Sequence, residues 1–143
     1  MKLVSACLVG INCNYKGESK NNGKLIEMLK NGELIPICPE ILGGFPVPRP
    51  GAWTTGDGLD VINGKEKVLE GDGNDVTEMF IKGAKEVLGF AQKLGIKEAI
   101  LKARSPSCGC GKIWVGGKLV DGDGVLTSLL KQNGIKVITE DDL

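Results

Sequence analysis

Short apolar runs alternate with helix-like segments along most of the chain, and this alternation restricts the fold more than any other feature. Residues 2–8 and 34–37 are apolar runs too short for independent helices. Between them, residues 21–30 place apolar side chains on one helical face, and Gly32 follows as a C-terminal stop. Strand, helix and strand in this order predict an α/β domain in three layers with a mostly parallel sheet.

The second half of the chain continues the alternation. Asp75 and Glu78 have the spacing of a capping box, and helical periodicity then runs to Gly95. A buried strand is expected at 99–101, a helix at 124–132 and a last strand at 135–138. Two short hairpin excursions are predicted, one joining 59–62 to 67–70 through Asn63-Gly64 and one joining 113–115 to 118–120.

A proline-rich segment interrupts this pattern. Prolines and glycines predict a fixed loop without regular structure over most of residues 39–58. An ordered loop of this length usually has a function. The residues responsible are Pro36, Pro39, Gly43, Gly44, Pro46, Pro48 and Pro50.

Composition excludes several classes of function. The 143 residues predict one domain, 1–143, and the balance of 18 basic and 18 acidic residues argues against binding long nucleic acid. The chain has no histidine, which excludes Ser-His-Asp and Cys-His catalysis, histidine-ligated zinc and haem. No apolar stretch approaches the roughly 20 residues of a membrane helix. An odd number of cysteines, five, without an export signal favours a reducing, cytoplasmic location.

Three cysteines follow predicted strands. Cys7 ends the first strand, Cys38 follows the second, and Cys108 lies in the loop after the strand at 99–101. The C-terminal ends of parallel strands meet at one edge of a sheet, so these thiols are expected to converge. Thiolates without imidazole suit soft metals, and an iron–sulfur cluster is the common case; if only three cysteines bind it, one iron stays open. Zinc held by four of the five thiols, with Cys13 or Cys110 taking part, stays open as an alternative.

Three motifs together resemble the thiouracil desulfidase (TudS-type) family. They are Ser5-Ala6-Cys7-Leu8, Cys38-Pro39-Glu40 and Ser105-Pro106-Ser107-Cys108-Gly109, in this order over nearly the whole chain. The resemblance implies a Rossmann-like α/β domain and a 4Fe-4S cluster held by Cys7, Cys38 and Cys108. It also implies removal of sulfur from thiolated uracil or its nucleoside or nucleotide. One departure stands out, because the chain has Gly51-Ala52-Trp53 where many relatives have Pro-Ala-Glu.

Roles for individual side chains follow from this resemblance. Glu40 is expected to be the general base that activates water, and Ser105 to orient water or pass a proton. Arg49, Lys102 and Tyr15 are expected to contact the substrate, a small thiolated pyrimidine. Simpler roles stay open at this point: loop bracing for Glu40, Arg49 and Lys102, a turn for Ser105, and packing for Tyr15. The alternative function is a non-catalytic module whose thiols hold zinc or sense oxidation. The sequence does not fix the oligomeric state.

Overall fold

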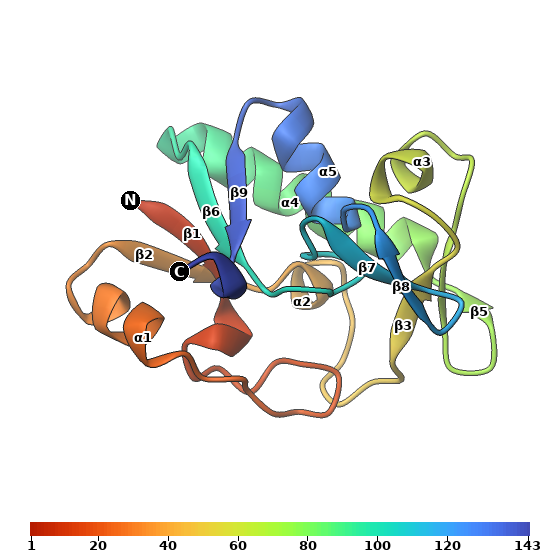
Figure 1. The fold of residues 1–143 in the computed structure, drawn as a ribbon, viewed down its shortest axis with the longest axis horizontal. Coiled ribbons are helices and arrows are strands. Elements are labelled where there is room, and N and C mark those ends of the chain that lie inside the picture. Colours follow the sequence, from red (N-terminus) through yellow and green to blue (C-terminus); the bar gives the residue numbers. More distant parts are fainter.

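The computed structural model describes residues 1–143, and a parallel sheet of four strands forms one half of the molecule (Figure 1). Leu3 in the first strand pairs with Ile35 on one side and with Ala99 on the other. The chain therefore builds outward from the first strand in both directions, which makes the C-terminal end of this strand a topological switch point. In spatial order the strands are β2 (Leu34–Ile37), β1 (Lys2–Ser5), β6 (Glu98–Leu101) and β9 (Lys136–Thr139).

Helices cover both faces of this sheet. On one face, α1 (Gly23–Lys30) packs Leu25 against Val4 and Ile100. On the other face, Leu3 and Leu101 belong to the main core with apolar residues of α4 (Thr77–Leu94) and α5 (Val125–Gln132). Neighbouring residues of a strand point to opposite faces, so strands covered on both faces have continuous apolar sequences. This explains why the central strands show no alternation of apolar and polar residues.

A second, mixed sheet stands beside the first (Figure 1). One parallel pair, Thr54 with Val115, joins the antiparallel strands β3, β4 and β5 to the predicted hairpin at 112–121, which gives five strands. All other pairs in this sheet are antiparallel. In spatial order its strands are β5 (Asn74–Asp75), β4 (Val68–Glu70), β3 (Ala52–Thr54), β7 (Lys112–Val115) and β8 (Lys118–Asp121). The mixed α/β class is thus confirmed, with two sheets in place of one.

Two local predictions are wrong. Residues 59–62 form a helix, α3 (Gly58–Ile62), and Asn63-Gly64 ends this helix instead of turning a hairpin. Gly64 has a φ of +79°, as helix C-termini often require, so the same dipeptide suits either structure. The proline-rich segment also contains β3 and a short helix, α2 (Pro39–Leu42). A proline at the first helical position lacks only an N–H that would have no helical partner.

The start of α4 also differs from the prediction, whereas its end agrees. The helix begins at Thr77, and Asp75 accepts hydrogen bonds from the Thr77 amide and hydroxyl at 2.9 and 2.6 Å. These bonds, which lower the pKa of Asp75, replace the predicted capping box with Glu78. Gly95 ends the helix with a φ of +69°, as its position predicted. The other predicted helices and strands agree with the structure to within a few residues.

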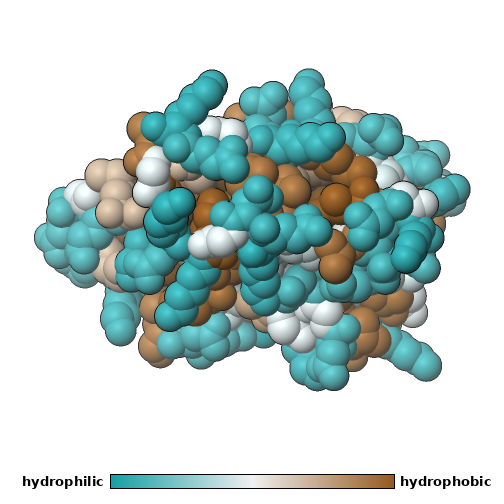
Figure 2. All heavy atoms as spheres, turned by 90° about the horizontal axis from the view of Figure 1, so that it is seen from above, coloured by the Kyte–Doolittle hydropathy of each residue, from teal (hydrophilic) through white to brown (hydrophobic).

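The face of the molecule seen from above is mostly hydrophilic. Seen from above, charged and polar side chains cover most of the molecule, and apolar groups lie between them in separate areas (Figure 2). None of the helices is both long and apolar enough to cross a bilayer.

Two glycines let α2 lie directly on α4. A Cβ on Gly83 would lie 2.0 Å from the carbonyl oxygen of Pro39, and one on Gly43 would lie 2.2 Å from that of Met79. Real Cβ atoms do not come this close to backbone, so a larger residue at either position must separate the helices. The contact fixes α2, and with it the positions of Cys38 and Glu40.

Gly83→Ala is expected to lower the free energy of unfolding by about 1–3 kcal/mol, the usual cost of overpacking. Helix propensity alone predicts the opposite sign, a gain of up to about 1 kcal/mol. Gly89→Ala is the matched control, because it lies on the same helix with nothing within 4 Å of its added Cβ. Urea unfolding of both variants measures the difference. Equal stabilisation by the two substitutions would show that α2 moves away at no cost.

Candidate functional site

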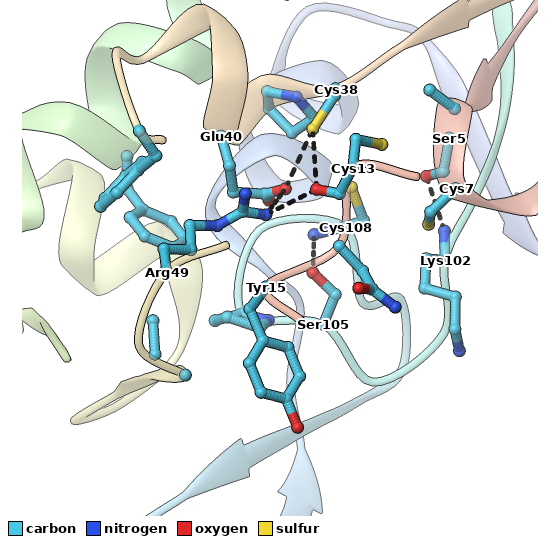
Figure 3. Close-up of a pocket in the computed structure, with 18 of the residues that line it drawn as sticks. Ser5, Cys7, Cys13, Tyr15, Cys38, Glu40, Arg49, Lys102, Ser105 and Cys108 are labelled. Carbon is cyan, nitrogen blue, oxygen red and sulfur yellow. Dashed lines mark hydrogen bonds and ion pairs between the residues drawn. The ribbon is translucent and has the colours of Figure 1, made fainter. Parts of the chain in front are cut away.

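A cavity of about 440 Å³ opens at the C-terminal edge of the parallel sheet. This volume is typical of small-molecule sites, which measure about 300–1,000 Å³. Figure 3 shows four thiols around it, with Glu40 and Arg49 on one side and Lys102 on the other. The four thiols belong to Cys7, Cys13, Cys38 and Cys108.

The three cysteines that follow strands reach the cavity from three different elements. Cys7 lies in a single 3-10 turn, Ala6–Leu8, directly after β1. Cys38 is the N-cap of α2 directly after β2, and Cys108 lies in the loop that follows β6. The structure therefore brings these thiols together, as expected from the shared edge of parallel strands. Cys110 lies outside the cavity, and its thiol donates to the carbonyl oxygen of Val137 at 3.6 Å.

The loop that carries Cys108 is fixed by hydrogen bonds. The Ser105 hydroxyl oxygen accepts from the amides of Ser107 and Cys108 at 3.2 and 3.1 Å. The Thr127 hydroxyl donates to the Cys108 carbonyl oxygen at 2.8 Å, which ties the loop to α5. A Cβ on Gly124 would lie 2.3 Å from the Ser107 carbonyl oxygen, so the loop also packs directly on the start of α5. Ser105 thus shapes the loop and at the same time lines the cavity.

Glu40 and Arg49 form a largely buried ion pair at the cavity wall. Glu40 Oε2 lies 3.4 Å from Arg49 Nη2, and the side chains are 16 % and 7 % exposed. The same oxygen accepts from the Cys38 thiol at 3.5 Å. Arg49 also donates to the carbonyl oxygens of Cys13 at 3.0 Å and Pro46 at 3.2 Å. Burial raises the pKa of Glu40, and the Arg49 guanidinium partly offsets this rise.

Three of the cavity thiols are held in their neutral form. Burial raises the pKa of Cys7 to about 11, with further contributions from the charges of Glu40 and Cys38. Burial also raises the pKa of Cys108, and a hydrogen bond with Cys13 raises that of Cys38. The nearby carboxylate disfavours additional negative charge at each of these sulfurs. This environment does not favour a free thiolate nucleophile, whereas a bound metal deprotonates its thiol ligands.

The donor set fits an iron–sulfur cluster better than a single zinc ion. The cavity offers four sulfur donors and no imidazole. No group of three or more cysteine, aspartate or glutamate side chains is placed to share one metal ion. A cluster carries its irons at separate corners, so its thiolates bind different irons and lie further apart than the ligands of one ion. The three strand-end thiols reach the cavity from separate elements, which is compatible with binding different irons.

The remaining predicted residues also lie at the cavity. Lys102 donates its amide to the Ser5 hydroxyl at 2.8 Å, and its ammonium group lies 2.8 Å from Glu140 Oε2. Tyr15 is 46 % exposed at the cavity wall, close to Gly51. Both residues reach the cavity, and the charge of Lys102 is already paired.

Several wall residues, and Glu140 beside them, have no counterpart in the sequence predictions. Glu140 comes directly after β9, and it accepts from the Ala103 amide at 2.7 Å as well as from Lys102. The rule of converging strand ends applies to β9 too, so this residue had a signal. The others come from loops, from the second sheet and, for Phe80, from α4, and the sequence does not indicate that they face the cavity. They are Lys20, Phe45, Glu70, Phe80, Arg104 and Trp114.

Three similarities to known proteins span almost the entire chain. The model of the family described as 2-thiouracil desulfurase matches residues 3–142. The uncharacterized protein YbbK of Bacillus subtilis (strain 168) is 43 % identical over 147 residues, covering 100 % of this chain and 97 % of that protein. The solved structure of a [4Fe-4S]-dependent thiouracil desulfidase, TudS, is 39 % identical with a TM-score of 0.88, covering 99 % of this chain and 91 % of that one.

Proposed function

The chain belongs to the 2-thiouracil desulfurase family, and from this we propose that it is a [4Fe-4S]-dependent desulfidase acting on thiolated uracil, as base, nucleoside or nucleotide. Family membership confirms the resemblance first seen in the motifs. The observation that carries the proposal is the cavity in which Cys7, Cys38 and Cys108 face the buried Glu40. The parallel sheet with helices on both faces supports a Rossmann-like, three-layer core as part of the same proposal.

The three strand-end cysteines, Cys7, Cys38 and Cys108, are the residues that would hold the cluster. Each belongs to one of the family-like motifs, and all three line the cavity. When bound by three thiolates, a 4Fe-4S cluster supplies an open iron that acts as a soft Lewis acid toward a thiocarbonyl sulfur. The wall opposite the thiols then determines how water and the pyrimidine are placed.

Glu40 is the residue proposed to activate water. Arg49 and the Cys38 thiol engage Oε2, which leaves Oε1 without a protein partner. A carboxylate oxygen in this position can accept the proton of a water that attacks the ring carbon bearing sulfur. Water then replaces sulfur by oxygen, and no net electron transfer takes place. Arg49 makes three contacts with the protein, which favours a role in positioning Glu40 over direct contact with substrate.

Ser105 is proposed to act as a hydrogen-bond donor. Its hydroxyl oxygen already accepts from two backbone amides. The hydroxyl hydrogen is therefore available to donate a hydrogen bond to a group in the cavity. Ser105 can therefore orient the attacking water or donate to the ring. Lys102 and Tyr15 stay proposed substrate contacts, with the Tyr15 ring offering a face to a pyrimidine.

Anaerobic reconstitution of the wild-type protein tests this function. We expect about four irons and four sulfides per chain, as a 4Fe-4S cluster requires. The loaded protein should convert thiouracil to uracil with release of sulfide and without added reductant or oxidant. The loss of thiocarbonyl absorbance and the sulfide released are measured together. Stoichiometric zinc with no iron, or a requirement for an electron donor at each turnover, would overturn the proposal. The zinc result would support the non-catalytic module instead.

A further inference from the structure

Asn14 is a polar wall residue of the cavity, in the loop between β1 and α1. It is half-buried, and Arg49 holds the residues on both sides of it. The Arg49 guanidinium donates to the Cys13 carbonyl oxygen at 3.0 Å, a contact drawn in Figure 3. The Arg49 amide donates to the Tyr15 carbonyl oxygen at 2.8 Å. The backbone of Asn14 is therefore fixed to the buried ion pair of Arg49 and Glu40.

The side-chain amide of Asn14 has one fixed orientation. Its Oδ1 accepts from the backbone amides of Lys16 at 3.1 Å and Glu18 at 2.8 Å. Backbone amides only donate, so the side-chain oxygen faces them and the NH2 group points away from them. The turn is also closed by the backbone, because the Asn14 amide donates to the Glu18 carbonyl oxygen at 3.1 Å. This turn therefore uses the oxygen of the side chain and leaves its nitrogen free.

The Nδ2 atom of Asn14 makes no hydrogen bond to the protein. Its two N–H groups are thus available to a ligand in the cavity. The site lies close to the proposed cluster ligands, because Cys38 Sγ is 3.9 Å from the carbonyl oxygen of Cys13, the residue next to Asn14. A neutral donor held rigidly at a cavity wall suits a neutral acceptor such as a carbonyl oxygen. Groups of this kind fix the orientation of a ligand and provide specificity.

We infer that Asn14 selects uracil-type rings by donating a hydrogen of Nδ2 to the ring carbonyl oxygen that 2-thiouracil retains. When the sulfur of this ring points to the thiols, the other ring groups face the wall. In 2-thiocytosine an amine takes the place of the carbonyl oxygen, and an amine cannot accept from Asn14. Two donors that face each other both stay unpaired, and this cost discriminates between the rings. The inference rests on the proposed function, because it names the base that this site takes.

Asn14→Asp tests the donor separately from the turn. Aspartate keeps an oxygen that accepts from the two backbone amides, but it replaces the N–H donors by an acceptor. The preference for uracil over cytosine should therefore fall by about tenfold or more. Equilibrium dialysis with radiolabelled bases gives both dissociation constants, on reconstituted protein where iron binds and on cluster-free protein otherwise. Asn12→Asp is the matched control, because it adds the same charge at an exposed position of the same loop outside the cavity, and it should keep the wild-type preference.

Turnover separates this inference from the proposed function. In the loaded enzyme, the ratio of kcat/KM for 2-thiouracil to that for 2-thiocytosine should fall with the binding preference. Equal losses for both bases in Asn14→Asp, an unchanged preference, or no binding of uracil to the wild type would overturn the inference. If the preference shifts as expected but the wild type releases no sulfide from 2-thiouracil, the proposed function fails and the base selection stands. Where Asn14→Asp does not fold, Asn14→Ser, whose hydroxyl can form a similar turn, should lose the preference for uracil, and retention of this preference would overturn the inference.

Discussion

Cys108→Ala is expected to abolish cluster binding, whereas Cys110→Ala, two residues away, should bind iron and sulfide as the wild type does. The first substitution removes one of three proposed thiolate ligands in the cavity. The second removes a thiol that donates to the Val137 carbonyl oxygen outside it. Both variants replace a cysteine of the same loop by alanine. A difference in their iron content therefore depends on where the removed sulfur lies. Iron, sulfide and the visible spectrum after anaerobic reconstitution give the measurement.

The fold of the Cys108→Ala variant should survive, because the hydrogen bonds that fix this loop use backbone atoms of residue 108. Its amide donates to Ser105 and its carbonyl oxygen accepts from Thr127, and alanine keeps both groups. Far-UV circular dichroism and a urea midpoint near that of the wild type would confirm this. Equal iron content in the two variants would contradict the ligand assignment, and loss of iron from both would assign Cys110 a role that the cavity does not explain.

The parallel sheet could be predicted from the sequence because its strands carry a strong local signal. Strands buried on both faces are continuous apolar runs, and glycines such as Gly95 and Gly134 mark the helix ends between them. In the second sheet only the hairpin of β7 and β8 could be predicted, and no local signal shows how the strands of this sheet join. Its strands are two to four residues long, and a single pair, Thr54 with Val115, joins its two halves. Pairing between residues so far apart in the chain depends on the tertiary structure.

The candidate site could also be predicted only in part. Cys7, Cys38 and Cys108 could be brought together from the sequence, since the topology of a parallel sheet places strand ends at one edge. Cys13 lies in the middle of a loop, where no rule gives the direction of a side chain. The sequence singled out Glu40 and Arg49 separately, but their ion pair depends on the path of the chain between α2 and β3. The position of a cysteine at the end of a parallel strand thus predicts that it is a candidate ligand. The residues that surround these cysteines are known only from the structure.

Glu40→Gln is expected to lower kcat by about 10²–10⁴-fold, the usual contribution of a general base, while iron and sulfide content stay unchanged. Glutamine has the shape of glutamate, and its oxygen can still accept from Arg49. It cannot take a proton from water at neutral pH. The ground-state contacts of the substrate are retained, so KM should change little. Steady-state kinetics on protein of known cluster content separate the two parameters.

Glu70→Gln is the matched control for this variant. Glu70 lines the same cavity from β4, and the substitution makes the same chemical change. We expect its kcat to stay within a few-fold of the wild type. If Glu40→Gln loses iron, the carboxylate serves to hold the Cys38 segment and the proposed role in proton transfer is wrong. If Glu40→Gln turns over normally with a full cluster, another group accepts the proton, and Ser105, the other polar side chain held rigidly at the cavity wall, becomes the residue to replace next.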